Sequence, residues 1–379
     1  MKSLIEKFSV LDDPRDIRGK RHKLIDIIIM TIYAILCGYT DFVNIADFIK
    51  LKEDYFTELL GLKYGTPSHD CLSRVFAIID PKAFMRLFIE WVKEIVGEKG
   101  DFIAIDGKAI RSATDKINNG NIPYILSAFL TDIGVSIGQL KIEDKSSEIT
   151  TIPDLLEIID VKNKIVTIDA IGTQEKIANK IVEKNGNYCL KVKSNQESLM
   201  DNIKTFFDLE DKENDLDIAY YETKYEKNHG RIEKRKYFLS YKIDCISDKE
   251  KWKTAKAIGK VEVYREENGK KSITEHYYII STKMSLQMFE RATRNHWNIE
   301  TQLHWRLDVI LDEDHSKSKQ GNSIDNLAII RKIVFNLIRF DTLMGEKLTM
   351  KKKMTRYLFD FKNIENLIFK VIPHIDSNI

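Results

Sequence analysis

The chain has few cysteines, and their number and spacing narrow the class of protein to which it belongs. Only four occur in 379 residues, Cys37, Cys71, Cys189 and Cys245, and no two of them form a CxxC pair. This scatter argues against a disulfide framework and predicts reduced thiols in a cytoplasmic protein. The longest uncharged run, residues 27–40, is too short to span a bilayer and reads as a core helix. We therefore expect neither a membrane segment nor a signal peptide.

An excess of charge of one sign is also missing. Sixty lysines and arginines face 58 aspartates and glutamates, which leaves a formal net charge of +2. The whole molecule is not a polycation, so a nucleic-acid partner would have to meet local basic patches. Three such runs exist, and each is also compatible with an ordinary solvated face: residues 18–23, 224–236 and 351–353. A P-loop, a dinucleotide-binding fingerprint and a nucleophile elbow are all absent from the sequence.

Three acidic residues stand out from ordinary surface charge. Asp106 lies in FIAIDGKAI and Asp169 in KIVTIDAIGTQ, two apolar, β-branched runs that predict buried strands. Glu300 lies in RNHWNIETQLHWRLDVI, which predicts a long helix. A carboxylate in a core strand is costly unless it is paired or binds a cation. Three such acids together favour a binding site for a hard cation such as Mg²⁺. The alternative for each single acid is that it caps a helix or pairs with a nearby lysine.

The order of predicted elements indicates an α/β fold behind a helical N-terminal part. Residues 1–97 read as short helices, and we expect them to form a DNA-binding domain. Three strands follow, separated by turn signals, and then an α-β-α-β-α alternation whose later strands should be parallel. A charged, tyrosine-rich stretch interrupts this order and predicts a β-rich insertion. The resulting division is 1–97 helical, 98–345 catalytic with the insertion at about 209–274, and 346–379 a helical tail.

The predicted helix from residue 285 to about 310 carries two stripes. One is apolar and formed by Ile299, Leu303, Leu307 and Ile310, at helical spacing. Beside it runs a polar stripe that places Glu300 at the border between core and cleft. His296 and His304 in that stripe also permit a zinc interpretation, although no cysteine cluster supports it. The flanking residues Trp297 and Trp305 are expected in the core.

Ligands of open α/β sheets collect beyond the carboxyl ends of parallel strands. Asp169 ends its strand, so Asp106 can face the same cation if its strand lies alongside. Two cations about 4 Å apart, bridged by carboxylates, can activate water or a 3′-hydroxyl for in-line displacement at phosphorus. Carboxylates suit this chemistry because they stay ionised at neutral pH and bind hard cations through oxygen.

At these residues the sequence resembles DDE-type insertion-sequence transposases of the H-repeat-associated (ISAs-type) family. The resemblance runs in order from about residue 12 to residue 335, over most of the chain. Several motifs in series are more specific than any one of them. They are DPRDIRGKRHKL, TPSHDCLSRVF, IAIDGKAIR, KSSEITTIPDLLEIID, VTIDAIGTQ, YCLKVKSNQ, HGRIEKR, YYIIST and HWNIETQLHWRLDV.

The resemblance implies a ribonuclease-H-like catalytic core, β-β-β-α-β-α-β-α, whose acidic triad is Asp106, Asp169 and Glu300. It implies a transposase that cuts double-stranded DNA at the terminal inverted repeats of its element and joins the ends to target DNA. The resemblance also implies two Mg²⁺ or Mn²⁺ ions as cofactors. It implies a homodimer on DNA and a cytoplasmic, nucleoid-associated location. A nuclease that never joins strands and a catalytically silent DNA-binding relative are the alternatives.

One departure from the wider relatives concerns the helix around Glu300. Those relatives place Tyr, Arg and Lys where this chain has Thr293, His296 and Leu307, so phosphate contacts do not carry over directly. His296 is the candidate substitute for the arginine. Basic residues near the acids are the other candidates for contacts to the DNA backbone, which position DNA without reading its sequence. They are Lys108, Arg111, Lys191, Lys193 and Arg231, the last beside His229.

Overall fold

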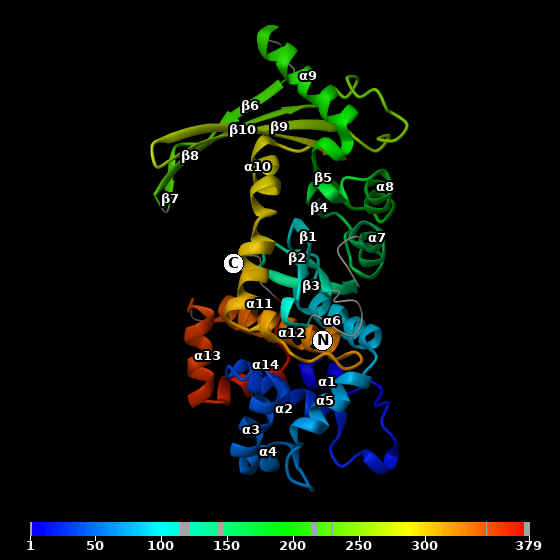
Figure 1. The fold of residues 1–379 in the computed structure, drawn as a ribbon, viewed down its shortest axis with the longest axis vertical. Coiled ribbons are helices and arrows are strands. Elements are labelled where there is room, and N and C mark those ends of the chain that lie inside the picture. Colours follow the sequence, from blue (N-terminus) through cyan, green and yellow to red (C-terminus); the bar gives the residue numbers. More distant parts are fainter. Residues whose placement is uncertain are drawn as a thin grey trace. The chain divides into compact units, whose positions relative to one another are not determined.

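A computed structural model describes residues 2–113, 122–142, 147–213, 218–228, 230–345 and 347–374. The chain forms two compact units (Figure 1). The first comprises Met1–Gly100, Gly107–Thr151 and Glu300–Ile379, and the second comprises Asp101–Asp106 and Ile152–Ile299. Strand β1 (Phe102–Ala109) therefore contributes its first half to the second unit and its last residues to the first. Among the described residues, no helix has the length and apolar character needed to cross a membrane.

The helical N-terminal region is confirmed, and polar side chains cap the first turns of several of its helices. The Asp41 carboxylate accepts hydrogen bonds from the backbone N–H groups of Val43 and Asn44, and Ser68 accepts one from Cys71. Such side chains satisfy donors that the first turn of a helix leaves unpaired. The helices are α1 (Leu4–Phe8), α2 (Leu24–Leu36), α3 (Phe42–Leu51), α4 (Glu53–Leu60), α5 (His69–Ile78) and α6 (Pro81–Val96).

The first unit is organised around helix α12 (Ser323–Met344), which packs against α2, α5, α6 and strand β3. Helix α2 is buried along nearly its whole length, which confirms it as a core helix. Strands β2 (Tyr124–Leu130) and β3 (Val135–Ile142) pair antiparallel in this unit, with a β-bulge at Ala128 and Phe129. The C-terminal residues form α13 (Met350–Phe359) and α14 (Lys362–Phe369).

The predicted catalytic order of elements is confirmed along the chain. After β1, β2 and β3 come α7 (Glu148–Ile158), β4 (Ile165–Ile168), α8 (Glu175–Glu183), β5 (Asn187–Val192) and α9 (Glu197–Glu213). In the second unit β1 pairs parallel with β4, and β4 pairs parallel with β5. This mixed α/β arrangement is the fold class expected from the sequence.

The predicted insertion is β-rich, as expected, and extends the sheet of the second unit in the order β1-β4-β5-β10-β9-β8-β6. Figure 1 shows helices α9 and α10 (Leu286–Asn295) on opposite sides of these inserted strands. The Phe289 ring of α10 lies so close to Gly259 that a Cβ there would sit 2.4 Å from it. The strands are β6 (Ile218–Glu222), β7 (Glu226–Asn228), β8 (Arg231–Ser240), β9 (Ala257–Glu267) and β10 (Lys270–Ile280), with β7 paired to β8.

The single long helix predicted from residue 285 to 310 is wrong. Helix α10 ends at Asn295, and after a turn the chain forms a π-helical turn, η6 (Ile299–His304), followed by α11 (Trp305–Val309). A π-helical turn inserts an extra residue into the helical repeat, which apolar periodicity alone does not reveal, and such turns are frequent at functional sites. Glu300 lies within this turn.

Candidate active site

Asp106 and Asp169 lie at matching positions on neighbouring parallel strands of the second unit. The register of β1 against β4 pairs Ile105 with Ile168, and each aspartate is the next residue along its chain. Carboxyl ends of parallel strands share one edge of a sheet, so both acids belong to that edge. Their strands are buried as predicted, but Asp106 itself is half-buried and Asp169 is exposed. The prediction of buried strands is therefore correct, but neither aspartate is itself buried.

The turn after Asp169 is held by hydrogen bonds to the end of β5. Its carboxylate caps the short helix η4 (Ala170–Gly172) by accepting from the Ala170 N–H at 2.7 Å. The Asn195 amide donates to the Ala170 carbonyl at 2.8 Å, and the Thr173 hydroxyl donates to the Lys191 carbonyl at 2.6 Å. These bonds fix the backbone beside Asp169, while its exposed carboxylate faces solvent.

His296 contacts β4, the strand that precedes Asp169, through a hydrogen bond to Thr167. Its Nδ1 lies 3.1 Å from the Thr167 hydroxyl, and that hydroxyl donates to the Ile103 carbonyl at 3.3 Å. Since the hydroxyl has one proton to give, Nδ1–H of His296 is the donor of the first bond. Burial lowers the pKa of His296 to about 4, with Lys191 acting in the same direction and Asp169 opposing it. The ring is neutral at physiological pH, so it carries no charge for a phosphate contact.

Glu300 is the second residue of the π-helical turn, belongs to the first unit and is exposed. The apolar stripe predicted around it is confirmed at Ile299, Leu303 and Leu307, none of which is exposed to solvent. Burial of Trp297 and Trp305 was the wrong expectation, because these side chains are 59% and 53% exposed. Each lies two residues from a member of the stripe, which places it on another side of the helical segment.

Lys108 lies between two carboxylates in the first unit. Its Nζ is 2.5 Å from Asp308 on α11 and 2.8 Å from Glu313 on the short helix η7 (Glu313–His315). Burial opposes the charge on Lys108, but Glu313 and Asp308 outweigh it and raise the pKa of the lysine. This environment suits a structural ion pair rather than the contact with DNA expected from the sequence.

Glu313 is surrounded by further buried cations. Burial favours the neutral acid, yet Lys108, Lys332 and Arg331 lower the pKa of Glu313 to about 2. Lys332 donates to the Gln139 side chain at 2.6 Å, and Arg331 donates to the carbonyls of Leu311 and Thr40. The sequence gives no local signal for this network, because its members come from three separate segments that only the fold brings together.

The remaining basic candidates differ in exposure. The Lys193 ammonium is 3.8 Å from the Asp169 carboxylate, and its side chain is 53% exposed. Arg111 is exposed and bonds to Asp314 through its backbone N–H, whereas burial lowers the pKa of Lys191 on β5. Arg231 begins β8 and lies 3.6 Å from Glu233. Its neighbour His229 is outside the described residues.

The two aspartates provide the type of ligand that a hard cation binds. Asp106 and Asp169 each follow the last residue pair of the β1–β4 register, and their carboxylates are the oxygen ligands that Mg²⁺ and Mn²⁺ prefer. Gly107, directly after Asp106, leaves space that a side chain would fill: a Cβ there would lie 3.2 to 3.4 Å from the carboxyl group of Glu148. Glu148 is buried at the start of α7, and the sequence offered only its place in a motif as a signal. Within the described ranges, no group of three His, Cys, Asp or Glu side chains meets the geometry of a metal site.

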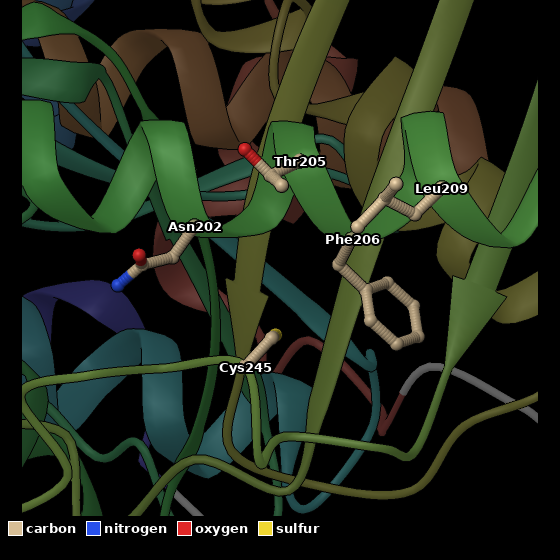
Figure 2. A pocket seen from close by; sticks show the side chains of 5 residues that line it. All are labelled: Asn202, Thr205, Phe206, Leu209 and Cys245. Atoms are coloured by element: carbon tan, nitrogen blue, oxygen red, sulfur yellow. The ribbon is translucent and has the colours of Figure 1, made fainter.

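A shallow cavity of about 230 Å³ lies elsewhere in the second unit, between α9 and the loop after β8. Figure 2 shows Cys245 beneath the helix that carries the other lining residues. No acid is among the described residues that line it, and burial raises the pKa of the Cys245 thiol to about 11, which keeps that thiol protonated. The cavity offers none of the groups that phosphoryl transfer needs.

Comparison with known proteins places the chain in a family. Residues 98–337 match the family described as transposase DDE domain, and residues 5–92 match the domain described as DDE_Tnp_1-associated. Two similar proteins of Escherichia coli strain K12 are named H repeat-associated putative transposases. YhhI is 35% identical over 95% of this chain and 96% of its own length, and YbfD is 37% identical over 65% of this chain and 98% of its own.

Among solved structures, a piggyBac transposase synaptic complex with hairpin DNA aligns with 94% of this chain and 74% of its own, at 11% identity and a TM-score of 0.44. The family match covers more than half of the residues, and YhhI is similar over nearly its entire length. The chain belongs to the DDE transposase family.

Proposed function

We propose that this DNA transposase cleaves the ends of its insertion sequence and joins them to target DNA through Asp106, Asp169 and Glu300. Membership of the DDE transposase family supplies the reaction class. The observation that carries the assignment of residues is the register of β1 and β4, which sets two aspartates side by side at the carboxyl edge of a sheet. Glu300 joins them in the proposal as the acid of the π-helical turn.

Divalent metal ions are general to this family. We propose Mg²⁺ or Mn²⁺, two ions in the active complex, held by the three acids. When bound, such ions supply a nucleophile at neutral pH and stabilise charge on the attacking and leaving oxygens. Lys193 lies 3.8 Å from Asp169 and offsets part of its negative charge while no cation is bound. Neutral His296 holds the helix turn onto the strands through Thr167, and so contributes orientation without charge.

DNA is the partner that the family implies. For contacts to its backbone we propose the exposed cations Lys193, Arg111 and Arg231, since an exposed side chain can exchange its counterion for a phosphate. Burial lowers the pKa of both Lys191 and His296, and we propose these two more enclosed residues as further contacts to DNA.

The proposed organisation has a DNA-contacting helical domain at 1–97, a catalytic domain at 98–345 and a helical tail at 346–379. Joining two ends of one element requires that both be held together, so we propose a homodimer on DNA. The reaction would take place in the cytoplasm, at the nucleoid, where the terminal inverted repeats and target DNA are found.

The test is strand cleavage of a duplex that carries one end of the element, taken from the DNA flanking this gene. The wild-type chain should cleave it only with Mg²⁺ or Mn²⁺, and Asp106→Asn, Asp169→Asn and Glu300→Gln should reduce cleavage to background. Asp101→Asn is the matched control, because Asp101 precedes the same strand and pairs with Arg291. Full cleavage by any of the three variants would remove that residue from the proposal.

A second arm supplies a target plasmid and looks for joined product. Joined product is the outcome expected of a transposase. Cleavage without joining would instead identify a nuclease, and binding without cleavage would identify a silent relative.

A further inference from the structure

Lys108 forms a buried bridge between two parts of the first unit that are distant in the sequence. It comes from the end of β1, whereas its partners Asp308 and Glu313 come from α11 and η7. The lysine side chain is 9% exposed and that of Glu313 is 1% exposed. These three residues are called the Lys108 bridge below.

The bridge joins the two chain segments that follow the proposed catalytic acids. Lys108 is two residues beyond Asp106 on the same strand. Asp308 is eight residues beyond Glu300, within the same run of helical turns. A shift of β1 along its axis, or a rotation of α11, would therefore break the short contacts at Lys108.

Stability alone is a poor reason for such a bridge. Removing charges from water costs as much as their attraction returns, and apolar residues of similar size often stabilise a core equally well. Buried ion pairs have their best-attested use in fixing the register of the elements they join. Both carboxylates lie 2.8 Å or less from the ammonium, so few of its N–H groups remain to bind another anion.

We propose that Lys108 is a positioning residue of the transposase, which fixes the strand end after Asp106 against the helical segment after Glu300. This inference rests on the proposed function of those two acids. It assigns Lys108 no contact with DNA. Loss of the bridge should slow the chemical step and leave DNA binding unchanged.

A second bridge in the chain provides a matched control. Lys260 on β9 has a side chain that is 5% exposed and lies between Glu262 at 3.0 Å and Glu275 at 3.1 Å. It belongs to the second unit and lies on a strand of the insertion, far along the chain from the three acids. Lys260→Met deletes the same kind of buried bridge as Lys108→Met does.

The experiment compares these two variants with the wild-type chain at a temperature where circular dichroism shows all three folded. Lys108→Met should lower kcat for cleavage at least tenfold at unchanged KM for DNA, and should raise the Mn²⁺ concentration needed for the half-maximal rate. Lys260→Met should leave these three quantities within twofold of wild type. The dependence of DNA affinity on salt should be the same for all three proteins.

Two results would overturn the inference. A loss of kcat no larger in Lys108→Met than in Lys260→Met would make the bridge merely structural. A salt slope reduced by about one in Lys108→Met would show a phosphate contact instead. If Lys108→Met does not fold, Asp308→Asn gives the same test, because Glu313 still pairs with the lysine. Failure of the wild-type chain to cleave DNA would count against the proposed function and not against the bridge.

Discussion

The two units of this protein place their charges differently. In the first unit, Glu313, Arg331 and Lys332 are almost fully buried around the end of β1. In the second unit, pairs such as Arg294 with Glu226 keep a third or more of each side chain exposed, although the pairs of Lys260 with Glu262 and of Arg235 with Glu233 are more enclosed. A buried charge is committed to its neighbours, whereas an exposed one can exchange its partner for a phosphate. The difference separates charges that shape the catalytic core from those available to DNA.

The largest expected effect comes from breaking the buried network. Glu313→Gln removes a carboxylate surrounded by Lys108, Lys332 and Arg331, so it should lower the free energy of unfolding by about 3–5 kcal/mol. Asp244→Asn, which breaks the exposed pair with Lys249, should leave that free energy unchanged. Urea unfolding of both variants measures the contrast. Equal effects would mean that the first unit does not depend on its buried charges.

The next effect is on the pH dependence of stability. Each unit contains a buried, neutral histidine that contributes to this dependence. Burial lowers the pKa of His296 to about 4 and that of His304 to about 3, both below the ordinary value of 6.5. Below pH 6.5 the unfolded chain takes up protons that the folded chain refuses, so stability falls as the pH drops towards these values. Glu313 acts in the same direction at lower pH, since its contribution is present above the ordinary carboxyl pKa and is lost as the pH falls through about 2.

Unfolding curves measured between pH 7 and 4 test this for the two units separately. His296→Gln and His304→Gln should each flatten the dependence of stability on pH, because glutamine does not titrate. A slope identical to that of the wild-type chain in either variant would show that its histidine is protonated in the folded state.

The smallest expected effect concerns the exposed cations. Lys193→Ala and Arg231→Ala should each weaken DNA binding about equally for all sequences and lower the salt slope by about one, with stability unchanged. Binding isotherms at several salt concentrations provide the measurement. A slope unaffected by both changes would exclude these residues from the DNA surface.

Much of the fold could be predicted because local patterns decided it. A short β-branched run predicts a buried strand such as β4, and Pro81 marks the start of a helix. The same reasoning failed at the helix that carries Glu300. Its apolar stripe gave the buried side correctly, but a π-helical turn changes the register without leaving a mark in composition.

Of the candidate site, only the acidic residues could be predicted from the sequence. Asp106 and Asp169 stood out because carboxylates are rare inside apolar, β-branched runs, whereas Lys108 resembled any basic residue near a site that acts on DNA. Only the fold brings Asp308 and Glu313 to it from 200 residues farther along the chain. A pairwise contact of that kind depends on tertiary packing, which no local pattern records.

The most direct measurement is anomalous diffraction from crystals grown with Mn²⁺ and DNA carrying one end of the element. A manganese peak coordinated by Asp106 and Asp169 is predicted, and it should vanish in Asp169→Asn. Mn²⁺ bound elsewhere, or its absence from these two carboxylates in crystals that hold cleaved DNA, would contradict the account.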